Sequence, residues 1–218
     1  MTVTLLADND VVIKLAQMDA YVDAMASMGF SPQQVGSLPV MLRYMGIADS
    51  NRRSRLTANA AEADRLNAVL QSIVKIEMTA DEASTAAMVM KAALLADLDV
   101  QEGELALCVV AVFRGDLDVC TGDKRALREL PALEQQWAAL GGLRGRLLCF
   151  EQFFKMLCTQ RGIARIRKAV TMSPRADETI SFVYDKTSEG GDRGFIKGIE
   201  LVINEHIAKP APGWLKSV

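Results

Sequence analysis

Two short acidic segments decide the fold that this sequence predicts: Leu5-Leu6-Ala7-Asp8-Asn9-Asp10 and Cys120-Thr121-Gly122-Asp123-Lys124. In each segment a carboxylate follows an apolar stretch typical of a buried strand, at the point where a helix is expected to begin. Ligands of parallel α/β sheets bind beyond the carboxyl ends of the strands. We therefore expect Asp8 and Asp123 to converge on one cation, as the acids of metal-dependent phosphoryl-transfer and nuclease sites do.

The rest of the chain alternates between helical and strand-like patterns. Apolar residues at helical spacing predict a helix over residues 11–28, and Ser31-Pro32 is expected to start the next helix. Glu102-Gly103-Glu104 opens a segment that is apolar almost all round, which is typical of a buried helix. Strands are expected at residues 2–7, 72–76 and 117–121, with residues 179–184 as an extra candidate. Strands separated by helices predict an α/β fold with a mostly parallel sheet and right-handed crossovers.

Length and composition limit the class of protein. With 218 residues, half of them hydrophobic, the chain is expected to form one large domain, or one domain with an extension. No uncharged apolar run approaches the roughly 18–20 residues of a membrane span. Asp8 and Asp10 interrupt the N-terminal stretch too early for a secretory signal. The sequence therefore predicts a protein that has no membrane partner.

The cysteines and the histidine argue against several kinds of site. None of the four cysteines forms a Cys-x-x-Cys pair, so we expect buried free thiols in a reducing cytoplasm. His206 is the only histidine, which argues against a zinc site and against Ser-His-Asp or Cys-His catalysis. Carboxylates remain as the natural catalytic groups.

The net charge of −2 hides an asymmetry. Residues 1–140 hold 12 Lys/Arg and 19 Asp/Glu, a balance of −7, whereas residues 141–218 hold 13 and 8, a balance of +5. An acidic body with a basic tail suits a metal site beside a phosphate-binding surface, and equally two parts of one protein that attract each other. The candidate nucleic-acid-binding side chains are Lys124, Arg125, Arg161, Arg165 and Lys168.

Three motifs, in this order, resemble those of PIN-domain proteins. Asp8-Asn9-Asp10-Val11-Val12-Ile13 is similar to their opening Asp-Thr-Asn-x-Leu-Ile. Gly103-Glu104-Leu105-Ala106-Leu107 is similar to their Gly-Glu-Ala helix start, and Thr121-Gly122-Asp123-Lys124 to their Thr-Asn-Asp turn. The resemblance covers roughly residues 1–140. We therefore expect a PIN-like domain at residues 1–145 and a C-terminal α/β extension at residues 146–218, packed on or beside it.

The resemblance implies a fold and an activity. PIN domains are three-layer α/β/α sandwiches, and many are Mg²⁺- or Mn²⁺-dependent ribonucleases, among them VapC-type toxins of toxin–antitoxin pairs. By this resemblance Asp8, Glu104 and Asp123 are the catalytic and metal-binding acids, and metal-activated water attacks the phosphodiester. Asp10 is a further candidate metal ligand. The implied partners are RNA, an antitoxin-like protein and a second copy of the chain in a homodimer.

The sequence also departs from the family pattern. PIN nucleases usually carry another acid on the second or third helix, but the corresponding stretch here, Leu38-Pro39-Val40-Met41-Leu42-Arg43, has none. A non-catalytic PIN-like module that binds nucleic acid or a partner is therefore one alternative. A haloacid-dehalogenase-type phosphatase is another, because Asp8-Asn9-Asp10-Val11 also matches the Asp-x-Asp-x start of that family. Asp8 would then be the nucleophile and Asp10 the acid/base.

Overall fold

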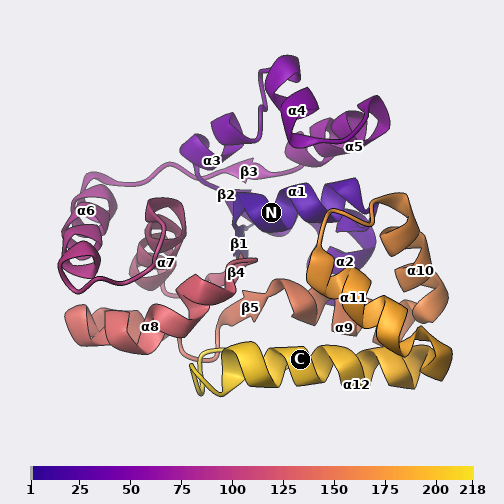
Figure 1. Ribbon diagram of the computed structural model, residues 1–218. Helices are drawn as coiled ribbons and strands as arrows, with labels where there is room; N and C mark the ends of the chain where they lie inside the picture. Colours follow the sequence, from indigo (N-terminus) through magenta and orange to yellow (C-terminus); the bar gives the residue numbers. More distant parts are fainter. Residues whose placement is uncertain (1) are drawn as a thin grey trace.

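The computed structural model describes residues 2–218, and a sheet of five parallel strands lies at its centre (Figure 1). The strands are β1 (Leu5–Ala7), β2 (Val35–Ser37), β3 (Val74–Lys75), β4 (Asp118–Thr121) and β5 (Leu147–Cys149). Their order across the sheet is β3-β2-β1-β4-β5, so β1 and β4 are direct neighbours. Ala7 of β1 lies opposite Cys120 of β4. The acidic segments that follow these two strands therefore meet at the same edge of the sheet.

Helices connect the strands and cover both faces of the sheet. The α-helices are α1 (Asn9–Gln17), α2 (Tyr21–Ser27), α3 (Pro39–Tyr44), α4 (Ser50–Leu56), α5 (Ala60–Leu70), α6 (Ala80–Leu95), α7 (Glu102–Arg114), α8 (Lys124–Gln136), α9 (Phe150–Arg161), α10 (Ile163–Met172), α11 (Glu178–Thr187) and α12 (Gly191–Ile203). Short 3₁₀ segments lie at Pro32–Gln34, Ala138–Leu143 and Ser188–Gly190, and a π-helical turn at Asn204–Ala208. Helices α6 and α7 lie on one side of the sheet, and α1, α2 and α9 on the other (Figure 1). The result is a three-layer α/β/α sandwich, which confirms the predicted fold class.

Burial explains why the central elements form where the sequence predicts them. All three residues of β1 are fully buried, and so is almost the whole body of α7 from Leu105 to Ala111. Helix α7 ends at Gly115, whose φ of 81° is a left-handed conformation that glycine adopts without strain. At the start of α6, Thr79 and Glu82 form the capping box that their spacing predicts. These elements hold the carboxyl edge of the sheet in place.

Two predictions about the first half of the chain are wrong. The helix predicted over residues 11–28 is divided into α1 and α2, because the backbone turns at Asp19, which has a φ of 50°. The helix predicted from Ser31 begins there as the 3₁₀ segment Pro32–Gln34, with Ser31 as its cap, but strand β2 then replaces its continuation. Gly36 in this strand allows a close approach, since a Cβ there would lie 2.7 Å from Cγ1 of Ile76 and 2.9 Å from Cγ1 of Val3. A strand of three residues shows too little periodicity to be distinguished from a helix in the sequence.

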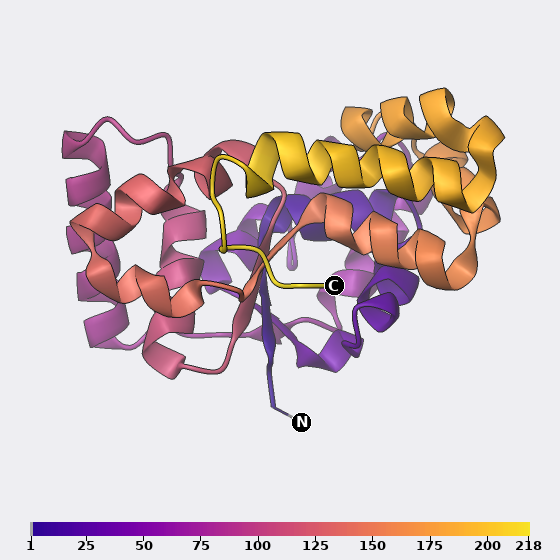
Figure 2. The same ribbon diagram turned by 90° about the horizontal axis from the view of Figure 1, so that it is seen from below.

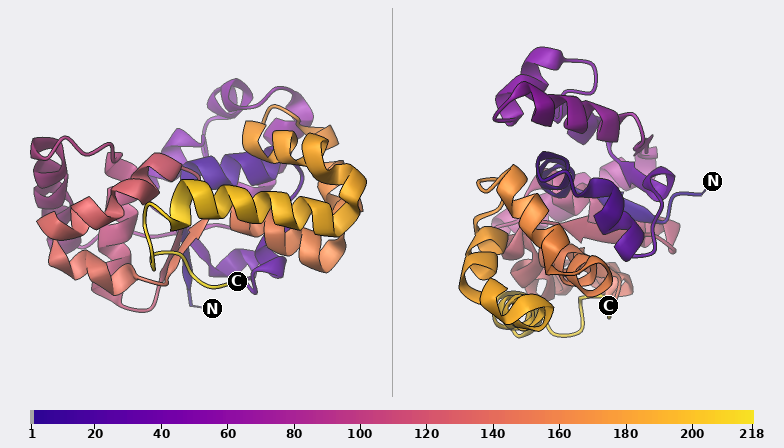
Figure 3. Two further views of the ribbon diagram at one scale, coloured as in Figure 1. Left: turned by 60° about the horizontal axis from the view of Figure 1, so that its bottom comes forward. Right: turned by 90° about the vertical axis from the view of Figure 1, so that its right-hand side faces the viewer.

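The C-terminal part shares the sheet and the core with the rest of the chain. Strand β5 begins two residues after the predicted boundary at residue 145 and pairs with β4. Helix α12 lies along α9 on one side of the molecule (Figures 2 and 3), and α11 packs against α12. The last residues return to β5, where Trp214 is fully buried and the Lys216 amide donates to the Leu147 carbonyl.

The predicted extra strand at residues 179–184 is instead part of helix α11. The Asp177 side chain accepts a hydrogen bond from the Ile180 amide at 2.8 Å and so caps this helix. Beyond β5, the extension is therefore helical throughout its regular elements in the described chain.

The cysteines and the length of the apolar helices were also addressed by the sequence. Cys108, Cys120, Cys149 and Cys158 are all buried free thiols, as predicted. Among the helices of residues 2–218, none combines the length and the apolar character needed to cross a bilayer.

Candidate functional site

A polar hollow of about 350 Å³ opens at the carboxyl edge of β1 and β4. It brings together all four carboxylates predicted to form the site, although they come from three separate parts of the chain. Its lining consists of Asp8, Asn9, Asp10, Gln101, Glu104, Gly122, Asp123 and Arg125. The convergence follows from the topology, because β1 and β4 are adjacent and α7 starts beside them.

Asp8 sits between strand β1 and helix α1 and is 4% exposed. Its amide donates to the Cys120 carbonyl at 3.0 Å, which fixes the backbone against β4. Its Oδ1 accepts a hydrogen bond from the Asn9 amide at 2.7 Å. Burial, followed by repulsion from Asp10, raises the pKa of Asp8 to about 6. Asp8 is thus a buried carboxylate that carries its negative charge at an energetic cost.

Glu104 lies in the first turn of α7 and is 7% exposed. Its Oε1 accepts a hydrogen bond from the Thr121 hydroxyl at 2.9 Å, whereas its buried Oε2 has no hydrogen-bond partner among the described residues. Burial and the nearby charge of Asp8 raise the pKa of Glu104 to about 8. No basic side chain in residues 2–218 forms an ion pair with Asp8 or Glu104.

Asp123 is held differently. It caps α8, and its Oδ1 accepts a hydrogen bond from the Arg125 amide at 2.8 Å. Its Oδ2 accepts one from the Arg125 guanidinium at 3.0 Å and a longer one from Gln101 at 3.3 Å. Although burial opposes the charged form, the hydrogen bonds from Arg125 hold the pKa of Asp123 below its ordinary value. Asp123 is therefore an ionised carboxylate with a fixed orientation.

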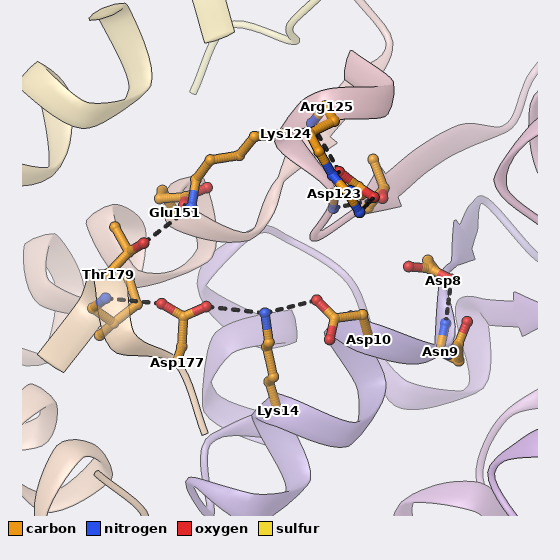
Figure 4. Close-up of polar contacts among 12 residues, drawn as sticks. Asp8, Asn9, Asp10, Lys14, Asp123, Lys124, Arg125, Glu151, Asp177 and Thr179 are labelled. Atoms are coloured by element: carbon orange, nitrogen blue, oxygen red, sulfur yellow. Dashed lines mark hydrogen bonds and ion pairs between the residues drawn. The ribbon is translucent and has the colours of Figure 1, made fainter. Parts of the chain in front are cut away.

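Asp10 lies at the rim of the hollow and turns toward Lys14, one turn further along α1 (Figure 4). The ion pair between Asp10 Oδ2 and Lys14 Nζ measures 2.7 Å. Lys14 also pairs with Asp177 of the C-terminal extension at 3.1 Å. Helix α1 begins at Asn9, so no segment separates Asp8 from α1 that could form the flap of a haloacid-dehalogenase-type site. Asp10 and Asp177 share one lysine, which ties the extension to the rim.

A second buried ion pair lies beside the hollow and was missed by the sequence analysis. Glu151, 1% exposed in the first turn of α9, pairs with Lys124 at 2.6 Å. Lys124 also donates to the Thr179 hydroxyl of α11 at 3.1 Å (Figure 4). The signal was present in the sequence, because Glu151 follows an apolar strand, as Asp8 and Asp123 do. Residues 147–157 nevertheless resemble one continuous buried segment, because they are largely apolar, and this conceals the strand-to-helix turn before Glu151.

The predicted nucleic-acid-binding residues fall into two separate places. Lys124 and Arg125 flank the hollow, and both are engaged with carboxylates there. Arg165 pairs with Asp23 at 2.7 Å, and Lys168 with Asp19 at 3.0 Å, past the far end of α1. Nine residues of helix span about 13 Å, so α1 separates this second group from the acids. The remaining residue of the group, Arg161, is exposed at the end of α9.

The donor set of the hollow fits a hard divalent cation. Clustered carboxylate oxygens are the ligands that Mg²⁺ and Mn²⁺ prefer. The unpartnered Oε2 of Glu104 and the raised pKa values of Asp8 and Glu104 are the features that a positive charge would relieve. As the side chains are oriented here, no group of three His, Cys, Asp or Glu residues within residues 2–218 encloses a metal position.

Comparisons of the chain with protein-family models, with curated proteins and with solved structures find no match.

Proposed function

We propose that this chain is a divalent-metal-dependent ribonuclease of the PIN-like kind, with Asp8, Glu104 and Asp123 as its metal-site acids. The single observation that carries the proposal is the pair of buried carboxylates, Asp8 and Glu104, which face one polar hollow without a basic partner. An uncompensated buried charge is costly, and a divalent cation bound by both carboxylates would relieve that cost. The hollow also lies at the sheet edge where ligands of parallel α/β folds bind.

The residues of the hollow have separate tasks in this proposal. A bound Mg²⁺ or Mn²⁺ supplies acidified water and neutralises charge on the scissile phosphate. Asp8 and Glu104 would hold the ion, and the Thr121 hydroxyl orients Glu104 by its hydrogen bond. Asp123, oriented by the first turn of α8, completes the negative site. Arg125 is exposed beside Asp123 and binds a phosphate oxygen of the substrate.

The proposal is tested by cleavage of mixed structured and single-stranded RNAs in Mg²⁺, Mn²⁺ or EDTA. Wild type is expected to cut RNA only with metal, and Asp8→Asn and Asp123→Asn are each expected to lower the rate at least a hundredfold. Asp64→Asn, which neutralises an exposed acid on α5, serves as the matched control and is expected to retain the wild-type rate. Equal rates in Asp8→Asn and wild type would rule out this site as the source of cleavage.

A second candidate is a PIN-like module that binds nucleic acid or a partner without catalysis. The observation that favours it lies in α3, where Leu42 is buried, Arg43 is exposed, and no acid points toward the hollow from this helix. A site with three acids instead of four would then serve binding alone. This candidate predicts no turnover by well-folded wild type with either metal, together with retained RNA binding. An antitoxin-like partner and a homodimer stay predictions of the resemblance.

A further inference from the structure

A basic surface with an exposed aromatic ring lies on α3 and α4, at the top of the molecule in Figure 1. Residues 39–57 hold four arginines and one acid, within a chain whose overall charge is −2. Arg43, Tyr44, Arg52 and Arg55 are all exposed, and the ring of Tyr44 is 44% accessible. We call these four residues the α3–α4 surface. The sequence pattern does not reveal this surface, because its arginines are divided between two short helices.

The arginines of this surface are free to bind an external anion. In the described chain, residues 2–218, neither Arg43, Arg52 nor Arg55 forms an ion pair with a carboxylate. The Arg52 guanidinium instead lies over the Tyr44 ring, 4.8 Å from its centroid. Arg165 and Lys168, by contrast, are neutralised by nearby aspartates. The α3–α4 surface therefore carries an uncompensated positive charge beside a ring that can stack on a base.

A groove lies next to this surface, and its lining includes residues that adjoin Glu104 in the sequence. The groove, of about 760 Å³, runs between α3, α6 and α7, and Arg43 and Val40 line it on one side. Glu102 and Gly103 also line it, and they lie in the same turn of α7 as Glu104, which lines the hollow. Most of its lining is apolar, including Leu38, Pro39, Ala86, Ala87 and Met90, and its charged lining is Arg43 and Lys91 against Glu77 and Glu102.

A second, separate hollow has Tyr44, the residue after Arg43, in its lining. This hollow, of about 340 Å³, is lined by Tyr44, Arg52 and Arg55 together with Leu56 and Asp49. Asp49 is occupied in part, because its Oδ1 caps α4 by accepting a hydrogen bond from the Arg52 amide at 3.0 Å. Apolar side chains and an exposed tyrosine ring suit the bases of an unpaired strand, and guanidinium groups suit its phosphates.

We infer that the α3–α4 surface binds single-stranded RNA and guides it through the groove to the acidic hollow. The inference rests on the proposed ribonuclease function and names its substrate class. Arg52 and Arg55 contact backbone phosphates, Tyr44 stacks on one base, and Arg43 contacts the strand where it enters the groove. A duplex cannot present its bases to Tyr44 or to the apolar groove, so the surface selects unpaired RNA.

The test is fluorescence anisotropy with a labelled 12-nucleotide RNA in EDTA, where metal-dependent cleavage cannot interfere. The double variant Arg52→Gln/Arg55→Gln is expected to bind at least tenfold more weakly than wild type. The slope of log Kd against the logarithm of the salt concentration is also expected to decrease by about 1.4, because each phosphate contact to a single strand contributes about 0.7 to it. Tyr44→Ala is expected to weaken binding about tenfold with an unchanged salt slope, and Tyr44→Phe to bind as wild type does.

The matched control removes two positive charges elsewhere. Arg175→Gln/Arg193→Gln replaces two exposed arginines of the C-terminal extension and is expected to leave affinity within about twofold of wild type. All the substituted side chains are exposed, and circular dichroism verifies that each variant is folded. The inference is overturned if both double variants lose affinity equally, if the α3–α4 variants bind like wild type, or if duplex RNA of the same sequence binds as tightly as the single strand.

Failure of this inference and failure of the proposed function give different results. If cleavage depends on metal and on Asp8, but the α3–α4 variants bind and cut normally, only this inference is refuted. If RNA binding depends on Arg52 and Arg55 but no metal supports cleavage, the surface stands and the ribonuclease proposal falls.

Discussion

Replacing Glu104 by glutamine is expected to stabilise the metal-free protein at neutral pH. Burial and the charge of Asp8 raise the pKa of Glu104 from 4.5 to about 8. At pH 7 such a shift destabilises the folded state by about 3 kcal/mol relative to an uncharged group. Glutamine has nearly the same shape and can still accept the hydrogen bond from Thr121. Its buried amide without a partner costs about 1 kcal/mol, so the expected net gain is about 2 kcal/mol.

The stability difference between Glu104→Gln and wild type is expected to depend on pH. A carboxyl whose pKa is raised by folding does not destabilise the folded state when the pH lies below its pKa in the unfolded chain. The destabilisation grows as the pH rises from that value to the pKa in the folded protein. Glu104→Gln should therefore be up to about 1 kcal/mol less stable than wild type at pH 4.5, where only the cost of its amide counts. The stability of the variant relative to wild type should increase up to about pH 8 and then level off. For a chain of this length, 2 kcal/mol corresponds to about 4–8 °C in Tm.

The assay is thermal and urea unfolding of both proteins in EDTA at pH 5, 7 and 8. Glu102→Gln is the matched control, because Glu102 lies in the same helical turn but is exposed, and its replacement should change Tm by less than about 1 °C. The reasoning is refuted if Glu104→Gln is less stable than wild type at pH 8, or if the difference between them does not change with pH.

Three further predictions concern the surroundings of the site. Gly122→Ala would place a Cβ 2.2 Å from Oδ2 of Asp10, so we expect a loss of about 1–2 kcal/mol in urea unfolding that is absent in the Asp10→Ala background. Arg114→Gln leaves the buried Glu82 without its cation and should destabilise the protein by about 2 kcal/mol at pH 7. Because Arg114 lowers the pKa of Glu82, this difference should vanish as the pH falls below the ordinary carboxyl range, which a pH series of unfolding curves checks. Trp214→Ala should cost about 3–5 kcal/mol in a single cooperative transition, since the fully buried ring belongs to the common core; a separate early transition of the C-terminal part would contradict this.

The acidic edge of the sheet could be predicted from the sequence. Asp8 and Asp123 each follow a run of buried strand residues, and parallel strands bring such residues to one edge whatever the rest of the chain does. Glu104 was predicted from the resemblance of Gly103-Glu104-Leu105 to a PIN helix start, and the helix that follows is apolar almost all round and therefore buried. These inferences depend on local patterns, which a single sequence contains.

Other features depend on which distant segments meet, and no local pattern contains that information. Strand β2 is defined by its neighbours β1 and β3 rather than by its own three residues. Residues 179–184 have the composition of a strand, but the Asp177 cap and the packing of α11 on α12 make them helical. Arg165 and Asp23 are 142 positions apart, so the neutralisation of Arg165 could not be foreseen.

Binding of Mn²⁺ to the metal-free protein tests the central claim most directly, because it requires neither the right RNA nor turnover. Calorimetric titration at pH 8 of wild type, Asp8→Asn, Glu104→Gln and the control Asp64→Asn would measure it. The account predicts saturable binding by wild type and Asp64→Asn that is weakened at least tenfold in Asp8→Asn and Glu104→Gln. Wild-type protein that binds no Mn²⁺, or binds it equally well after Asp8→Asn, would contradict the assignment of this hollow as a metal centre.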